Sequence, residues 1–241
     1  MKRPLLPARR QFVLAVGLFV IALVVRLPAG FATLALPPAI QLRGVEGSFW
    51  EGRASAVGIN GVLVQEQVAW SFLPGALLDA KLAWAVRGRL ADQTSRLELA
   101  LRPRGAELNG VSLALPLEPL AALHPQLKPA QLGATLRVTA RRLAAQAPVE
   151  ATVAIEQLFT PLAAAGELGS YRLDLKGADG QGDWQLATVA GTLKVAGQGS
   201  FDANRGRLGG RAVLTPQAPI PGLSPVLASL PKDGEGFVVT F

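Results

Sequence analysis

The sequence contains no cysteine, a single histidine (His124) and a single tyrosine (Tyr171). The absence of cysteine excludes disulfides, thiol nucleophiles and thiolate metal ligands. His124 precedes Pro125 in a segment that supplies neither a nucleophile nor an orienting acid, so we interpret it as structural rather than as a general base. We therefore expect no catalytic, cofactor-binding or metal-binding residues, and no cofactor.

Acidic residues are missing from the first ten positions, where Lys2, Arg3, Arg9 and Arg10 lie. The formal net charge of +7 depends largely on these four cations, because the remaining chain carries 20 basic and 17 acidic residues. The remaining arginines alternate with acids and form no continuous basic stripe with interleaved aromatics. The charge pattern therefore argues against nucleic-acid binding.

An uncharged, strongly apolar run spans residues 11–25 and ends at Arg26. Cations before such a run keep the preceding tail in the cytoplasm. We expect Arg9, Arg10 and Arg26 to flank a membrane anchor and to extend their charged ends toward the interfaces. Residues 1–10 are then a cytoplasmic basic tail, and the rest of the chain is exported.

Two outcomes remain open for this segment. Residues 11–32 form a transmembrane anchor if the apolar stretch after Arg26 extends the run, which is otherwise short for a bilayer. Gly30 and Ala32 form a small-x-small pattern that a signal peptidase accepts, so a cleaved signal peptide is the alternative. In either case residues 37–241 are expected to form a periplasmic antiparallel β domain.

Beyond the apolar run, hydrophobic residues recur with the period of two that is typical of half-buried strands. The clearest alternating positions are Leu82, Trp84, Val86, Leu97, Leu99, Leu101, Leu136, Val138, Val153, Ile155, Leu173, Leu175, Leu193 and Val195. Tight turns are predicted at Asn60-Gly61, Asn109-Gly110, Asp179-Gly180 and Asp233-Gly234. The predicted fold is mainly β: an N-terminal transmembrane helix followed by an antiparallel sheet (a curved sheet, sandwich or open barrel) with a few short helices.

Three short segments are predicted to be helical. Thr160 and Pro161 are suited to the N-cap and first turn of a helix that would run to Leu168. A second segment, 118–127, is apolar at helical spacing but is interrupted by prolines. The third is 224–230, which ends before a proline.

Glu46 and Glu51 bracket the aromatic pair Phe49 and Trp50. Paired carboxylates beside an aromatic suit glycoside hydrolysis, but the surrounding glycines indicate turns or bulges in which both acids are solvated. We therefore expect one of the aromatic side chains to anchor the core while the glutamates face water.

Three segments carry a family resemblance: V-E-G-S-F-W-E-G-R-A (45–54), V-A-W-S-F-L-P-G-A-L-L-D-A-K-L (68–82) and L-G-S-Y-R-L-D-L-K-G (168–177). With the N-terminal tail and apolar run, they resemble the type II secretion system protein N family over essentially the whole chain. The resemblance implies a single-pass inner-membrane protein with its bulk in the periplasm. It also implies a non-catalytic accessory component of the secretion machine, which acts as a scaffold or interaction subunit of the inner-membrane platform.

The shared segments contain large aromatics beside glycine or proline. We expect Gly47, Trp50, Gly52, Trp70 and Pro74 to specify the fold rather than to contact a ligand. Expected partners are the membrane and the other inner-membrane and periplasmic secretion subunits.

A second function stays open from the residues alone. A curved sheet with a concave face of Leu, Val and Ala would hold acyl chains, as in a periplasmic lipid or hydrophobic-ligand carrier of AsmA-like type. The same alternation also describes a sheet closed over its own core.

Overall fold

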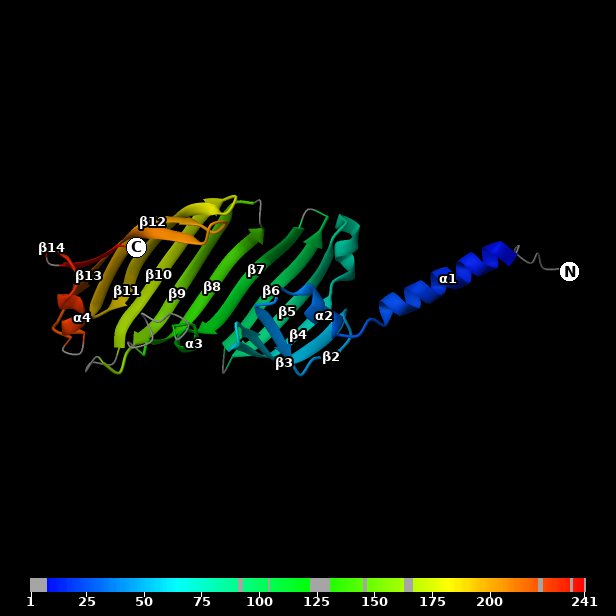
Figure 1. Cartoon of the computed structure of the whole chain (residues 1–241), viewed down its shortest axis with the longest axis horizontal. Coiled ribbons are helices and arrows are strands. Elements are labelled where there is room, and N and C mark those ends of the chain that lie inside the picture. Colours follow the sequence, from blue (N-terminus) through cyan, green and yellow to red (C-terminus); the bar gives the residue numbers. More distant parts are fainter. Residues whose placement is uncertain are drawn as a thin grey trace.

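The computed structural model describes residues 8–90, 93–103, 105–121, 131–144, 147–162, 167–220, 223–234 and 236–240. A helix leads away from one end of a long β domain, whose strands follow one another in chain order (Figure 1). The prediction of a mainly β, antiparallel protein is confirmed.

The helices are short after the first one. They are α1 (Ala8–Val25), α2 (Phe31–Ala35), the 3₁₀ helix η1 (Pro74–Asp79), α3 (Leu117–Ala121) and α4 (Ser224–Ala228). The strands of the N-terminal half are β1 (Ile40–Arg43), β2 (Glu46–Gly47), β3 (Glu51–Ile59), β4 (Val62–Phe72), β5 (Leu82–Leu90), β6 (Gln93–Arg102) and β7 (Gly105–Pro116). Those of the C-terminal half are β8 (Gly133–Ala144), β9 (Val149–Phe159), β10 (Glu167–Ala178), β11 (Gln181–Gly191), β12 (Leu193–Asp202), β13 (Arg207–Pro216), β14 (Lys232–Asp233) and β15 (Gly236–Thr240).

All fifteen strands belong to one open antiparallel sheet. Consecutive strands from β3 to β13 pair with each other, and β15 and β14 complete the far side. At the near side β1 and β2 pair with successive parts of β3 and together form one interrupted edge. The sequence left a curved sheet, a sandwich and an open barrel as alternatives, and the structure is a single curved sheet.

Among the described residues, no helix combines the length and the apolar character that crossing a membrane requires. Helix α1 ends at Val25, and the apolar residues after Arg26 do not extend it. Pro28 explains this end, because a proline disfavours helical backbone at the residue before it and cannot donate its own amide. The chain becomes helical again only in α2.

The predicted short helices are confirmed in part. α4 begins at Ser224 as expected, and α3 covers the start of the second predicted segment. The helix predicted from Thr160 to Leu168 is wrong at its end, because β10 begins at Glu167. His124 lies outside the described residues.

The predicted turn at Asn109-Gly110 is also wrong. Gly110 has a φ of +55° but lies inside β7, where the pairing with β6 shifts register between Arg96 and Glu98. A left-handed glycine within a strand is the signature of a bulge, and an Asn-Gly pair supplies one as readily as it supplies a turn. The other three dipeptides do lie at strand connections.

The two faces of the sheet differ in chemistry. Directly opposed residues on paired strands share a face, and these pairs are apolar along one face: Trp84 with Leu99, Val138 with Val153, Leu175 with Trp184, and Val195 with Leu214. The other face carries ion pairs such as Arg137 with Glu156, at 2.9 Å. The alternation predicted from the sequence is therefore confirmed as an apolar face and a charged face.

Small buried clusters lie at the two ends of the apolar face. At the C-terminal end Leu168, Leu193 and Ile220 are buried together. Toward the N-terminal end, β4 meets β7 through Gln65, whose Nε2 donates to the carbonyl of Ala114. The sheet therefore bends strongly between these strands.

Glu107 joins three neighbouring strands, β6, β7 and β8. Its carboxylate, only 7% exposed, accepts hydrogen bonds from Arg102 of β6 at 2.9 Å and from Arg142 of β8 at 2.6 Å. Burial alone would raise the pKa of Glu107, but the bonds from both arginines outweigh it and lower the pKa below its usual range. The carboxylate is therefore ionised at neutral pH.

The Glu107 carboxylate predicts an acid-dependent loss of stability. A pKa that is lower in the folded chain than in the unfolded one stabilises above the unfolded value, about 4.3, and the gain is lost as pH falls through the folded value. Glu107→Gln should lower the free energy of unfolding at pH 7 by about 1–2 kcal/mol, since both arginines are partly solvated. Urea denaturation of the full chain in mild detergent measures this.

The same denaturation repeated near pH 3 should show a much smaller difference between Glu107→Gln and the parent. The control is Glu150→Gln, because Glu150 is exposed on the neighbouring strand β9. A Glu107→Gln deficit that is equal at both pH values would contradict the electrostatic explanation.

Candidate functional site

The connection between α1 and the sheet is held by backbone hydrogen bonds. The amide of Ala29 donates to Gly47 and the amide of Phe49 donates to Leu27, at 3.2 and 2.8 Å, around an isolated bridge between Pro28 and Ser48. The chain that leaves α1 therefore pairs with the segment before β3 instead of forming a free linker. We call this region, with the aromatic residues around it, the junction.

Trp50 ties the helix itself to the junction. Its indole Nε1 donates to the carbonyl of Val24 at 2.8 Å. Val24 lies in the last turn of α1, where backbone carbonyls have no partner inside the helix. The Val24 carbonyl also accepts the amide of Leu27 at 3.3 Å, so the half-buried Trp50 supplies a second donor there and ties the end of α1 to the sheet.

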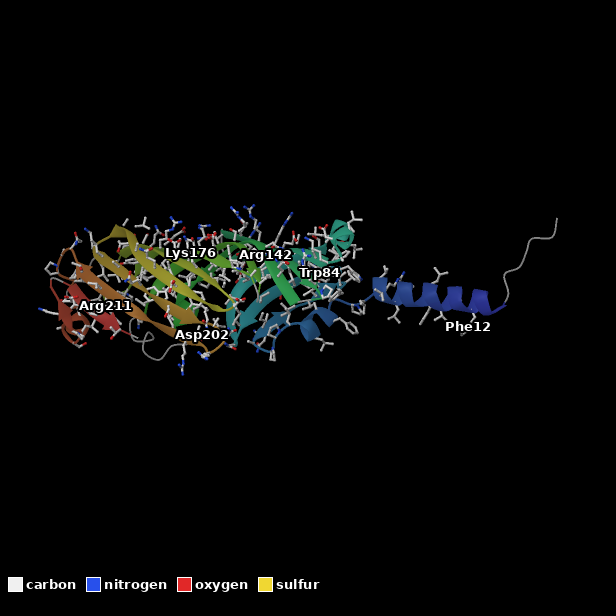
Figure 2. The ribbon with its side chains drawn as sticks, turned by 90° about the horizontal axis from the view of Figure 1, so that it is seen from above. Phe12, Trp84, Arg142, Lys176, Asp202 and Arg211 are labelled. Carbon is white, nitrogen blue, oxygen red and sulfur yellow. The ribbon has the colours of Figure 1, made fainter. Side chains whose placement is uncertain are left out.

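Two further indoles converge on a single carbonyl. The Nε1 atoms of Trp70 and Trp84 each donate to the oxygen of Phe49 at 3.2 Å. The ring of Trp84 stacks on Trp50 with centroids 6.2 Å apart, and Phe72 meets Trp50 edge-on at 4.8 Å. Figure 2 shows Trp84 at the α1 end of the sheet. The junction is thus an aromatic cluster with shared polar anchors.

The glycines of the predicted motif leave room for this cluster. Gly52 lies directly opposite Trp70, and a Cβ on Gly52 would stand 2.4 Å from the indole ring. Gly47 has a φ of +92°, and a Cβ there would stand 2.6 Å from the carbonyl oxygen of Glu51. Both positions therefore exclude a side chain, one because of an aromatic ring and the other because of backbone.

Pro74 lies two residues beyond Phe72 and starts η1. Its fixed φ suits the first turn of a helix, where its missing amide leaves no bond unmade. The five motif residues therefore belong to one end of the molecule. The sequence did not predict that Phe72 and Trp84 join these five residues, although Trp84 is one of the alternating apolar positions of a predicted strand.

The acidic pair that brackets the aromatics is exposed. Glu46 forms an ion pair with Arg53 across the β2–β3 pairing at 2.5 Å, and Glu51 lies at the start of β3. The described part of the chain contains no group of three or more His, Asp or Glu side chains that could hold a metal ion. The expectation that both glutamates face water is confirmed.

The structure describes the three arginines that we expect to flank the anchor to different extents. Arg26 is exposed directly after α1. Arg9 and Arg10 belong to the first turn of α1, but their side chains lie outside the described part of the structure. Phe12, Leu18 and Phe19 of α1 are 70%, 66% and 68% exposed, so the helix presents apolar side chains to its surroundings.

The apolar face forms a second candidate site. Trp84, Tyr171 and Trp184 are buried on it, but Val153 and Leu173 between them are only half-buried. The Tyr171 hydroxyl donates to the carbonyl of Leu193 at 2.8 Å, and burial raises the pKa of Tyr171 to about 12. The described residues named here therefore form an aliphatic and partly accessible surface whose tyrosine stays neutral at physiological pH.

The packing of Trp70 on Gly52 can be tested by adding one methyl group. Gly52→Ala should lower the free energy of unfolding by about 1–3 kcal/mol, because the new Cβ overlaps the indole ring and the backbone carbonyl of Glu46. Urea denaturation followed by tryptophan fluorescence measures this change. Gly75→Ala is the matched control, because a Cβ on Gly75 meets nothing within 4 Å. Equal stability of the two variants would exclude close packing at Gly52.

Comparison with known proteins gives one match. The sequence model of the family described as type II secretion system (T2SS), protein N, matches residues 38–240. Searches of curated proteins and of solved structures found no significant match. The matched range starts just before β1 and ends with β15, so it covers the entire sheet together with the junction motif. The chain therefore belongs to the type II secretion system protein N family.

Proposed function

We propose that this chain is a non-catalytic inner-membrane component of a type II secretion system, whose sheet serves as a scaffold for other subunits in the periplasm. In this proposal residues 1–10 are the cytoplasmic tail, 11–32 the anchoring region and 37–241 the periplasmic domain. Family membership supports the assignment to a type II secretion system. The observation that carries the rest is the apolar helix α1, joined directly to the sheet by the junction.

Helix α1 suits an anchor because it is apolar on all sides beyond its first turn. A helix of this kind needs either a protein core or lipid around it. No other described element forms extensive contacts with α1. Its apolar part, residues 11–25, gives about 22 Å of helix against a hydrocarbon core of ~30 Å, a mismatch that local thinning of the bilayer and flanking arginines would have to accommodate. Lipid is the environment that satisfies these side chains.

The sheet suits docking because its two edges are open. The β1–β2 edge lies beside the junction, and β14 and β15 close the opposite end only in part. Unpaired strand edges accept a further strand from a partner. Anchoring confines the sheet to the membrane surface and raises its effective concentration for the inner-membrane and periplasmic subunits.

Photo-crosslinking in intact cells tests the scaffold. A photoreactive residue at Gln41 of β1 or Lys232 of β14 should capture other secretion subunits, because both lie on edge strands. The same residue at Thr139, which is exposed in the middle of the sheet, is the control. A chain that captures no secretion subunit from either edge contradicts the scaffold, and a shortened, soluble product indicates a cleaved signal instead of an anchor.

A second function, a lipid or hydrophobic-ligand carrier, is favoured by the half-exposed apolar face. Val153→Asp places a charge on that face, whereas Ala154→Asp lies on the opposite face between Arg137 and Arg172. Mass spectrometry of the purified full chain should then find phospholipid with the parent and with Ala154→Asp, and much less with Val153→Asp. Purified parent without bound lipid contradicts the carrier.

A further inference from the structure

We propose that α2 and η1 form a second contact with the membrane: a lipid-facing patch that rests on the bilayer surface beside α1 and sets the tilt of the sheet. The patch consists of Phe31, Leu34, Leu77 and Leu78. This inference rests on the proposed anchoring by α1 and adds to it a surface that binds lipid headgroups and upper acyl chains.

The patch is the most exposed apolar surface of the β domain near α1. Phe31 and Leu34 of α2 are 48% and 79% exposed, and Leu77 and Leu78 of η1 are 55% and 92% exposed. Val189 and Leu208 are also strongly exposed, at 69% and 57%, but they lie on two different strands, β11 and β13. Exposed apolar side chains grouped on short helices are typical of interfacial membrane contacts.

The patch lies at the end of the sheet from which α1 emerges (Figure 1). In both views α2 and η1, the short helix coloured for residues 74–79, lie at this end of the domain. α4 and β14 occupy the opposite end. Both short helices therefore lie at the end of the domain that adjoins the membrane proposed around α1.

The junction holds both helices in this position. Phe31 begins α2 by donating its amide to Pro28, a residue already paired with Ser48. Phe72 donates its amide to the carbonyl of Trp50 and is followed at once by η1. Since Trp50 also binds Val24, no flexible linker separates the end of α1 from either helix.

The chemistry of the patch favours lipid over a protein partner. α2 contains no charged residue, and the only charge in η1 is Asp79, its last residue. Arg26, exposed between α1 and α2, is suited to lipid phosphate.

The lack of cysteine makes the test direct, because single cysteines can be introduced without background. Leu34→Cys and Leu78→Cys place a fluorescent label in the patch, and Leu18→Cys places one in α1. The matched controls are Val189→Cys and Leu208→Cys, which are exposed but distant. Each full chain is reconstituted in phosphatidylethanolamine–phosphatidylglycerol vesicles, and quenching by lipid-borne spin labels is measured.

The expected result is loss of fluorescence at positions 18, 34 and 78 and none at 189 or 208. Quenchers attached near the headgroup should act best at 34 and 78, and deep quenchers at 18. Quenching at 18 alone overturns the patch and leaves the anchor intact. No quenching at 18 overturns the anchor, and labels at 34 and 78 that respond only to aqueous iodide overturn the lipid contact.

Discussion

The rest of the architecture depends on the hydrogen bonds that the carbonyl of Phe49 accepts and on the one that the indole of Trp50 donates. One carbonyl accepts two indole donors, so Trp70 and Trp84 are brought together from β4 and β5. The adjacent indole binds the end of α1. The end of α1 and two strands, β4 and β5, therefore meet at two consecutive residues. This convergence explains why glycine is required opposite Trp70: the indole ring of Trp70 lies so close to the backbone of Gly52 that a Cβ there would overlap the ring.

The sheet itself achieves stability without a second complete layer. Its pairing is continuous from β1 to β14, so backbone polar groups are satisfied within the sheet except at its edges. Burial is concentrated at the two ends, where the C-terminal cluster and the bend between β4 and β7 remove side chains from water. The middle of the apolar face remains partly accessible, and it is the surface that the proposed ligand-carrier function would use.

Much of this fold follows from local sequence rules. Alternation at positions such as Leu173 and Leu175 predicts both the strands and the face that each side chain occupies, because a strand has a strict period of two. The two errors have local causes: Asn109-Gly110 satisfies a bulge as well as a turn, and from Glu167 onward the chain pairs with β9 where the helix was predicted to end.

The sequence predicted some of the residues that belong to the junction but not which contacts they make. The W-x-G spacing identified Trp50 and Gly52 as structural, but no local rule connects Trp50 to Val24, 26 residues earlier. Nor could the sequence show that β1 and β2 together form one edge of the sheet with a gap between them. Such features depend on how the sheet curves, and curvature results from many small register shifts, as between Glu66 and Ala69.

The distribution of charge constrains how a partner would be recognised. On the charged face, Arg137 pairs with Glu156, Arg172 with Asp174, and Arg142 with Glu107. These charges already neutralise one another, so docking there would exchange existing ion pairs for new ones with little net gain. Open edges and apolar surfaces gain more on binding, because their backbone groups and side chains lack protein partners in the free chain. In the scaffold role that we propose, strands and lipid would therefore be favoured over charged surfaces as partners.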